Sequence, residues 1–301
     1  TRCPDVPLCC PDNSETLSGC FRNGCPYAAE ILTMIIEKNL TGESRILRTE
    51  ARHRLKEGKG IRVFSRPDKL KSWLEDEGLK LDDRKHLITD AGKLIPGYDK
   101  SNGIEIFAHS PFAAYVDGEL VDRNGSSLIL HATFYCDEQK TKFILIGDTT
   151  HEVLTEIVNI TKAHKNECRL EWDIFDVPHH CSYMALNSEK GKDKTDPVED
   201  VKWLFDQGKT GGIIVSCSKT IPNNDDDDQP PHRQAANFYK DVATNILGEF
   251  VVTMEYPKSS DPAPLIITIE ESGATLKKKI CGAGVIMTSR QAPRAGVHNV
   301  R

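Results

Sequence analysis

Apolar and polar residues alternate in blocks through the middle of the chain. Residues 143 to 146 form a short apolar run that is typical of a buried strand, and the stretches 174 to 177 and 212 to 217 repeat it. Between the first two runs, residues 153 to 160 carry apolar side chains at helical spacing. Strands that alternate with helices predict a parallel sheet, so we expect an α/β fold.

Further elements on either side extend this pattern. Residues 126 to 136 and 141 to 147 are apolar stretches joined by a polar turn, which predicts an antiparallel pair. Residues 103 to 109 predict a strand ahead of this pair, and helices are expected at 197 to 208 and from about 233 to 242.

Polar residues follow three of the predicted strands. Asp148 follows the first, the pair His179 and His180 follows the second, and His232 comes after the third and its acidic loop. Parallel strands place such residues at one edge of the sheet, where α/β proteins bind ligands. Aspartate and histidine at one edge are typical of a metal site or an acid–base site.

The segments around these residues form a series with a fixed order. They are Arg123-Asn124-Gly125-Ser126-Ser127-Leu128, Ile146-Gly147-Asp148, Asp173-Ile174-Phe175-Asp176-Val177-Pro178-His179-His180-Cys181-Ser182, Ile213-Ile214-Val215-Ser216 and Pro231-His232. The series resembles the C-terminal half of the metallo-β-lactamase fold, and in particular the hydrolase domain of ComEC-type DNA-uptake proteins. The resemblance covers roughly residues 60 to 255.

The resemblance implies an αββα sandwich that is incomplete in its N-terminal half. The family's first metal-binding block, His-x-His-x-Asp-His, is absent from the sequence, Cys181 stands where the family has glycine, and Pro-His-Arg replaces Gly-His-Pro. Three explanations remain open. The chain is the C-terminal part of a longer or cleaved protein, a separate chain or fragment supplies the missing block, or the chain is a degenerate member.

The activity implied by the resemblance is metal-dependent hydrolysis of phosphodiester bonds in a nucleic acid or nucleotide. Two zinc ions, with manganese as the alternative, would be held by Asp148 as a bridging carboxylate and by His179 or His180, of which we favour His179. His109, at the end of its strand, is the best positional candidate for a further ligand. A metal-bound hydroxide is a strong nucleophile near neutral pH.

The remaining site residues implied by the resemblance act on the substrate. His232 would face the phosphate or protonate the leaving oxygen, and with Asp148 it forms the expected catalytic pair. Ser182 and Asn124 would orient the substrate or hydrogen-bond a metal ligand. A β-lactam or thioester hydrolase is less favoured, because the Val-Pro-His-His element resembles the nucleic-acid-associated branch.

The alternative interpretation is a non-catalytic scaffold that binds a protein or nucleic-acid partner. Two ligands from one chain seldom hold a catalytic zinc, which supports this interpretation. The basic segment 45 to 56 is either a solvated helix or a surface whose arginines bind phosphate.

We expect three parts along the chain. Residues 1–58 form a cysteine-rich and basic segment, 59–280 the metallo-β-lactamase-like domain, and 281–301 a disordered tail. Five of the ten cysteines lie in the first 25 residues. They are interpreted as a zinc knot, as disulfides of an exported protein, or as thiols of no special function.

Net charge changes the picture little. A formal charge of −6 gives no general case for nucleic-acid binding through bulk electrostatics. No apolar run reaches the roughly 18 residues that suggest a transmembrane helix. We therefore expect a cytoplasmic protein without a membrane partner.

Two polar loops flank the predicted site. Residues 183 to 195 follow the histidine pair directly, and we interpret them either as a mobile loop that closes over substrate or as a solvated linker. Residues 223 to 228 are acidic but lack EF-hand spacing, so a solvated loop is expected there.

Overall fold

A seven-stranded mixed sheet forms the centre of the computed structural model, which describes residues 42–64, 68–111 and 127–277. The strand order is β3-β4-β5-β6-β7-β8-β9. The strands are β3 (Lys93–Leu94), β4 (Ile104–Ser110), β5 (Ile129–Cys136), β6 (Gln139–Ile146), β7 (Trp172–Asp176), β8 (Gly208–Ser216) and β9 (Glu249–Val252). The expected α/β class is confirmed.

The sheet has an antiparallel half and a parallel half that meet at β6. Strands β3 to β6 pair antiparallel, and the predicted β5–β6 hairpin runs from Ile129 opposite Ile146 to Cys136 opposite Gln139. Strands β6 to β9 pair parallel, with Ile174 of β7 beside Phe143 and Ile213. The ends of β6, β7 and β8 therefore lie at one edge, as the sequence predicts.

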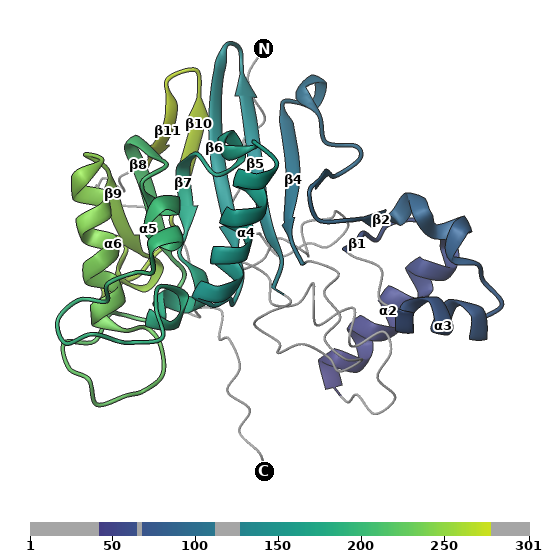
Figure 1. Ribbon diagram of the computed structural model, residues 1–301, viewed down its shortest axis with the longest axis horizontal. Coiled ribbons are helices and arrows are strands. Elements are labelled where there is room, and N and C mark those ends of the chain that lie inside the picture. Colours follow the sequence, from purple (N-terminus) through teal and green to yellow (C-terminus); the bar gives the residue numbers. More distant parts are fainter. Residues whose placement is uncertain (1–41, 65–67, 112–126, 278–301) are drawn as a thin grey trace.

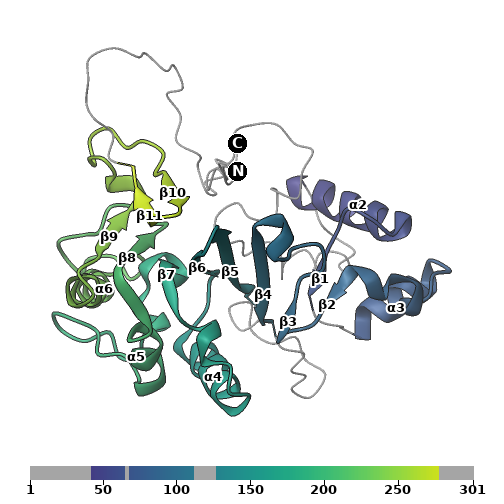
Figure 2. The same ribbon diagram turned by 90° about the horizontal axis from the view of Figure 1, so that it is seen from above.

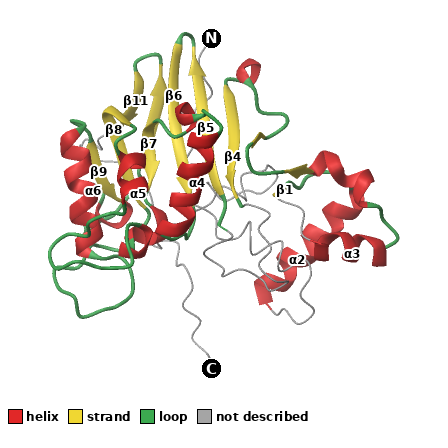
Figure 3. Ribbon diagram, in the orientation of Figure 1, coloured by secondary structure: helices red, strands yellow, loops and turns green. Residues whose placement is uncertain are grey.

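Three helices cover one face of the sheet (Figures 1 and 3). They are α4 (His151–Ala163), α5 (Glu199–Phe205) and α6 (Arg233–Asn245). Their apolar sides share a core with Trp172, Phe175 and Tyr239, which are all fully buried. Burial of such side chains contributes roughly 1.5–3 kcal/mol each. Ile160, which the sequence places on the apolar side of α4, is instead 37% exposed.

A small hairpin covers part of the opposite face. Strands β10 (Ile267–Glu270) and β11 (Gly273–Leu276) pair antiparallel. Figure 2 shows this pair on the side of the sheet opposite the helices α4, α5 and α6. Ile267 and Leu276 share a second core cluster with sheet residues such as Phe143 and Ile213.

A third apolar cluster lies beyond β4. It joins α2 (Gly42–Glu57), α3 (Asp68–Asp76), a 3-10 helix over Leu81–Leu87, and the short parallel pair β1 (Val63–Phe64) and β2 (Ile88–Thr89). The helix face with Ala51 and Leu55 is buried in this cluster together with Leu70 and Leu74 of α3. Segment 45 to 56 is thus part of a helix, and this helix shares its apolar cluster with residues beyond the predicted boundary at residue 58.

Several predictions concern residues outside the described ranges. These are the N-terminal cysteines, Asn124 and the tail from 281. Within the described ranges, no helix combines the length and apolar character needed to cross a bilayer.

Candidate functional site

The candidate site lies where β6, β7 and β8 end. Asp148 follows β6 after a single glycine, Pro178-His179-His180 follows β7, and Cys217 follows β8 directly. The parallel register of the three strands brings these segments together. The structure therefore places Asp148 and the histidine pair at the sheet edge that the sequence predicts for them.

His180, rather than the favoured His179, is the histidine that contacts Asp148. Its Nε2 atom lies 3.4 Å from Asp148 Oδ1, and its Nδ1 atom lies 2.8 Å from the carbonyl oxygen of Cys217. Because a carbonyl only accepts hydrogen bonds, Nδ1 carries the proton and donates it. In the neutral ring, Nε2 then presents a lone pair to the Asp148 carboxylate. A proton or a cation between these atoms makes the contact attractive.

An unusual backbone turn orients His180. His179 and His180 have φ angles of 50° and 52°, and Cys181 follows at 67°, so three consecutive non-glycine residues are left-handed. This conformation costs roughly 1–2 kcal/mol per residue. Hydrogen bonds hold the turn, from Ser182 N to His179 O at 2.9 Å and from His232 N to Cys181 O at 3.0 Å. Such retained strain is typical of functional sites.

Because the backbone at position 181 is left-handed, glycine suits this position. The same backbone predicts that valine at position 181 gives a less stable protein than alanine does, the reverse of the usual order for a buried residue. Cys181 is fully buried, a position where valine usually exceeds alanine in stability. We expect Cys181→Val to be about 2 kcal/mol less stable than Cys181→Ala, because a β-branched side chain is strained at positive φ and overfills the site. Cys181→Gly is expected to lie within about 1 kcal/mol of Cys181→Ala, since relief of strain offsets lost packing. Urea unfolding measures the series, and a valine variant as stable as the alanine variant would contradict the strain.

Asp176 is a site residue that the sequence reasoning missed. It is the last residue of β7 and is 7% exposed. Burial and, to a smaller extent, the Asp148 charge raise the pKa of its carboxyl to about 7, against hydrogen bonds from the Cys217 thiol and the Ile146 backbone that lower it. Two neighbouring carboxyls in such different environments are a common basis for acid–base chemistry.

The sequence contains a signal for Asp176. Its neighbours Ile174, Phe175 and Val177 are all apolar, so the sequence shows no polar–apolar alternation that would account for a carboxylate among them. Asp173, three residues earlier, matches the resembled motif but lies away from the site. Its Oδ2 accepts a hydrogen bond from Lys142 N at 2.7 Å and ties β7 to β6.

His232 is buried at the N-cap position of α6. Its Nε2 atom lies 3.2 Å from the Asp228 carbonyl oxygen, and its ring meets Tyr183 edge-on with centroids 4.9 Å apart. Burial lowers the pKa of His232, so the ring is neutral near pH 7 and donates from Nε2. Nδ1 is buried and has no hydrogen-bond partner among the described residues. Nδ1 can therefore accept a proton or a hydrogen bond, but it carries no proton to give. His232 is less well suited to protonating a leaving oxygen than the sequence suggests.

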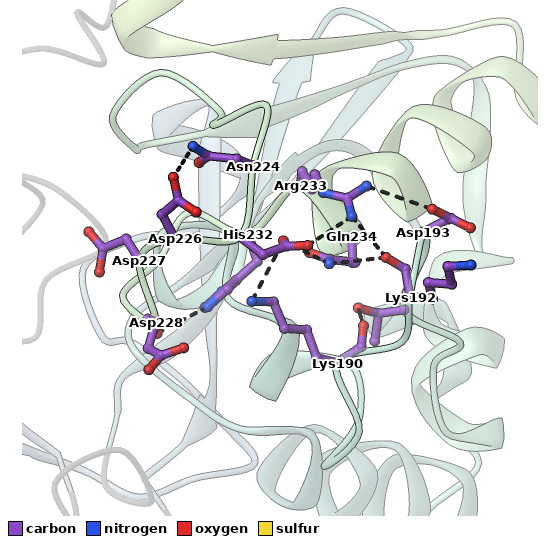
Figure 4. A network of polar contacts seen from close by, with 12 residues as sticks. Lys190, Lys192, Asp193, Asn224, Asp226, Asp227, Asp228, His232, Arg233 and Gln234 are labelled. Carbon is purple, nitrogen blue, oxygen red and sulfur yellow. Dashed lines mark hydrogen bonds and ion pairs between the residues drawn. The ribbon is translucent and has the colours of Figure 1, made fainter.

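The two polar loops are joined at the start of α6 (Figure 4). Asp225 of the acidic loop accepts hydrogen bonds from Arg233 Nη2 at 2.8 Å and from Gln234 Nε2 at 2.9 Å. The same two side chains donate to Lys192 O at 3.0 and 3.2 Å. Hydrogen bonds from Arg233 and Gln234 lower the pKa of Asp225 to about 2. The contacts tie both loops to the helix that begins at His232.

Two other predicted residues, His109 and Ser182, hydrogen-bond partners other than Asp148 and His180, and a third lies outside the described ranges. His109 is buried on the helix side of β4, where its Nε2 hydrogen-bonds Arg169 O at 3.0 Å and its ring packs against Phe107. Ser182 is buried, and its hydroxyl accepts from Met184 N at 3.3 Å. Asn124 lies outside the described residues.

The described residues include side chains of the kind that bind metals, but too few of them lie together to hold an ion. A histidine whose Nδ1 donates to a carbonyl, with a carboxylate beside Nε2, resembles half of a zinc site. No group of three or more histidine, cysteine or carboxylate side chains able to hold a metal occurs within the described part of the chain. Catalytic zinc normally needs three protein ligands. These residues by themselves therefore do not make a zinc site.

The comparisons with family models and with curated proteins assign no function to this chain. No protein-family model matches the sequence, and no curated protein matches it. The function is therefore inferred from the geometry at the sheet edge and from the motif resemblance.

Proposed function

We propose that the chain is a hydrolase of the metallo-β-lactamase type that acts on phosphodiester bonds at the edge of β6, β7 and β8. The observation that carries the proposal is the Asp148–His180 contact of 3.4 Å at that edge. Supporting it are the strained turn that orients His180 and the raised pKa of Asp176 beside the pair. The phosphodiester preference rests on the resemblance of the Val177-Pro178-His179-His180 element.

The chain's own residues divide the proton chemistry among them. Asp148 is 19% exposed and reaches both solvent and His180, so it is the residue placed to accept a proton from an attacking water. Cys217 O fixes the ring of His180 through Nδ1. Asp176 is a positioning residue, because it is buried and its charge interacts with that of Asp148, so its ionisation changes the electrostatic potential at Asp148.

A bound metal enters the proposal only with ligands from elsewhere. We propose that zinc, or manganese, binds Asp148 and His180 when residues outside the described ranges or a second chain complete the ligand set. The alternative function is a non-catalytic scaffold for a protein or nucleic-acid partner. It is favoured by the lack of a three-ligand group among the described residues.

Activity and metal content measured together separate these functions. The purified chain is assayed with bis(p-nitrophenyl) phosphate and with p-nitrophenyl phosphate, and its metals are counted by elemental mass spectrometry before and after chelation. We expect turnover of the diester in preference to the monoester, and loss of bound zinc or manganese in His180→Ala but not in His109→Ala. A chain that neither binds metal nor turns over the diester, yet unfolds cooperatively, would overturn hydrolysis by this chain alone and favour the scaffold.

A further inference from the structure

The start of α6 is held by a carboxylate from the acidic loop. His232 occupies the N-cap position, but its side chain makes no capping hydrogen bond. The first N–H groups of a helix lack intrahelical partners, and a negative charge beside them is stabilising. The Asp225 carboxylate supplies this charge, since it accepts hydrogen bonds from Arg233 Nη2 at 2.8 Å and from Gln234 Nε2 at 2.9 Å. Asp225 therefore fixes the first two residues of α6.

The loop that follows the histidine pair contacts α6 at two levels. Near the start of the helix, Lys192 O accepts hydrogen bonds from the side chains of Arg233 and Gln234 (Figure 4). About two turns farther along, Lys194 Nζ lies 2.8 Å from Asp241 Oδ2. The first contacts lie at the N-terminal end of α6, whereas the contact at Asp241 lies away from it.

Other ionic partners of the same groups are weaker. Lys190 Nζ lies 3.7 Å from Asp225 Oδ1, and Arg233 Nη1 lies 3.9 Å from Asp193 Oδ1. Both distances exceed those of hydrogen bonds, and the Asp193 side chain is 80% exposed, so water screens that ion pair. Asp225 is therefore a stronger partner of Arg233 than Asp193 is.

His232 connects the start of α6 to the strained turn. Its backbone N–H donates to Cys181 O at 3.0 Å, and Ser182 N donates to His179 O at 2.9 Å. The left-handed conformation of this turn is unfavourable by itself, so both hydrogen bonds contribute to holding it. A helix start that frays moves the His232 N–H away from Cys181 and removes one of the two.

The direction of the His180 ring depends on this turn. His180 has a φ angle of 52° and lies between two further left-handed residues. Its Nδ1 atom donates to Cys217 O at 2.8 Å, and its Nε2 atom lies 3.4 Å from Asp148 Oδ1. Because the Cα–Cβ direction follows the backbone angles, relaxation of the turn to ordinary angles moves the ring away from both partners.

We propose that Asp225 is a positioning residue for His180, acting through the start of α6 and the turn that His232 holds. The expected effect on turnover rests on the proposed hydrolysis, whereas the expected effect on the turn does not. The acidic loop then has a function at the sheet edge that its composition alone does not indicate.

Asp225→Asn tests this connection by hydrogen exchange of backbone amides, measured by NMR. Asparagine has one acceptor oxygen and a donor NH₂ group, so it can accept from Arg233 or Gln234 but not from both. We expect the amides of Ser182 and His232 to exchange about ten-fold faster, as for loss of a hydrogen bond to a charged group. Amides of the β5–β6 hairpin should exchange at an unchanged rate, which shows that the variant is folded.

Asp241→Asn is the matched control. It removes the same charge and weakens the contact with Lys194, but it acts away from the start of α6. The amides of Ser182 and His232 should exchange in this variant as they do in the unmodified chain.

The His180 ring supplies a readout that general loosening of the fold does not change. In the neutral ring, the bond to Cys217 O keeps the proton on Nδ1, which nitrogen NMR of isotopically labelled histidine detects. We expect a mixture of both tautomers in Asp225→Asn and a single tautomer in Asp241→Asn, with the signal identified by its loss in His180→Ala. In Asp225→Asn, kcat for bis(p-nitrophenyl) phosphate should fall about five-fold and KM should stay within about two-fold, because orientation is affected more than binding.

Two results would overturn the proposal. The first is exchange at Ser182 and His232 that is accelerated equally in Asp225→Asn and Asp241→Asn, which would indicate general loosening. The second is unchanged exchange together with a single His180 tautomer in Asp225→Asn. Faster exchange and mixed tautomers in a chain without diesterase activity would support the positioning and refute the proposed reaction.

Discussion

Asp148→Asn is expected to lower phosphodiester hydrolysis about a thousand-fold while leaving the fold intact. Asparagine keeps the shape of the side chain but cannot accept a proton, and loss of a positioned acid or base typically costs 10²–10⁴-fold. It also removes the charge 3.4 Å from His180 Nε2. Because the two residues act as a unit, the double variant Asp148→Asn/His180→Ala should be no less active than the weaker single variant.

The matched control for this change is Asp173→Asn on β7. The Asp173 carboxylate accepts a hydrogen bond from Lys142 N at 2.7 Å, and an asparagine oxygen can accept the same bond. Its activity should stay within about two-fold of the unmodified chain, as for substitutions away from a site. Steady-state turnover of bis(p-nitrophenyl) phosphate measures both variants. Full activity in Asp148→Asn, or an equal loss in Asp173→Asn, would place the reaction elsewhere.

The sequence predicts the sheet edge well because the relevant pattern is local. Apolar runs ending at Gly147-Asp148 and Pro178-His179 identify strands, and helices between them require parallel neighbours. Once the strands are parallel and adjacent, Asp148 and the histidine pair must lie at one edge. The same reasoning correctly gives α4, α6 and the β5–β6 hairpin.

The choice between two adjacent histidines does not follow from that pattern. It is made by the left-handed turn at 179 to 181, which directs His180 toward Asp148 and Cys217. No local sequence pattern without glycine indicates three consecutive left-handed residues, because tertiary contacts stabilise the strained conformation. Among these is the bond from His232 N to Cys181 O, across about fifty residues of sequence.

Other features of the site depend equally on distant contacts. The acidic loop is expected to be solvated from its composition, yet Asp225 bonds Arg233 and Gln234, which also bond Lys192. His109 lies near the end of strand β4, where a ligand is expected, but its Nε2 hydrogen-bonds the Arg169 carbonyl oxygen on the helix side of the sheet. A residue's position at the end of a strand predicts that it lies at the edge of the sheet. It does not predict the direction in which its side chain points.

Asp176→Asn is expected to gain stability relative to the unmodified chain as the pH rises. Burial raises the pKa of this carboxyl from 3.8 to about 7 in the folded protein. The folded state therefore holds the proton more tightly than the unfolded chain does. Between about pH 4 and pH 7, unfolding releases this proton, so the free energy of unfolding falls as the pH rises.

The size of the effect follows from the shift. About three pKa units at about 1.4 kcal/mol each give a limit on the order of 4 kcal/mol, and about 2–3 kcal/mol is expected between about pH 5 and pH 8. Burial lowers the pKa of His109 to about 4 and of His131 to about 3, so these residues destabilise the fold as the pH falls. Both proteins contain these histidines, and their contribution cancels in the difference between variant and unmodified chain.

Urea unfolding at a series of pH values measures this difference, with Asp173→Asn as the control that should run parallel to the unmodified chain. A constant difference for Asp176→Asn would mean that its carboxyl ionises normally in the folded protein. The same titration connects stability to the proposed reaction, because ionised Asp176 places a second negative charge beside Asp148. The pH dependence of hydrolysis should therefore contain an inflection near pH 7 that Asp176→Asn removes, while Asp173→Asn retains it.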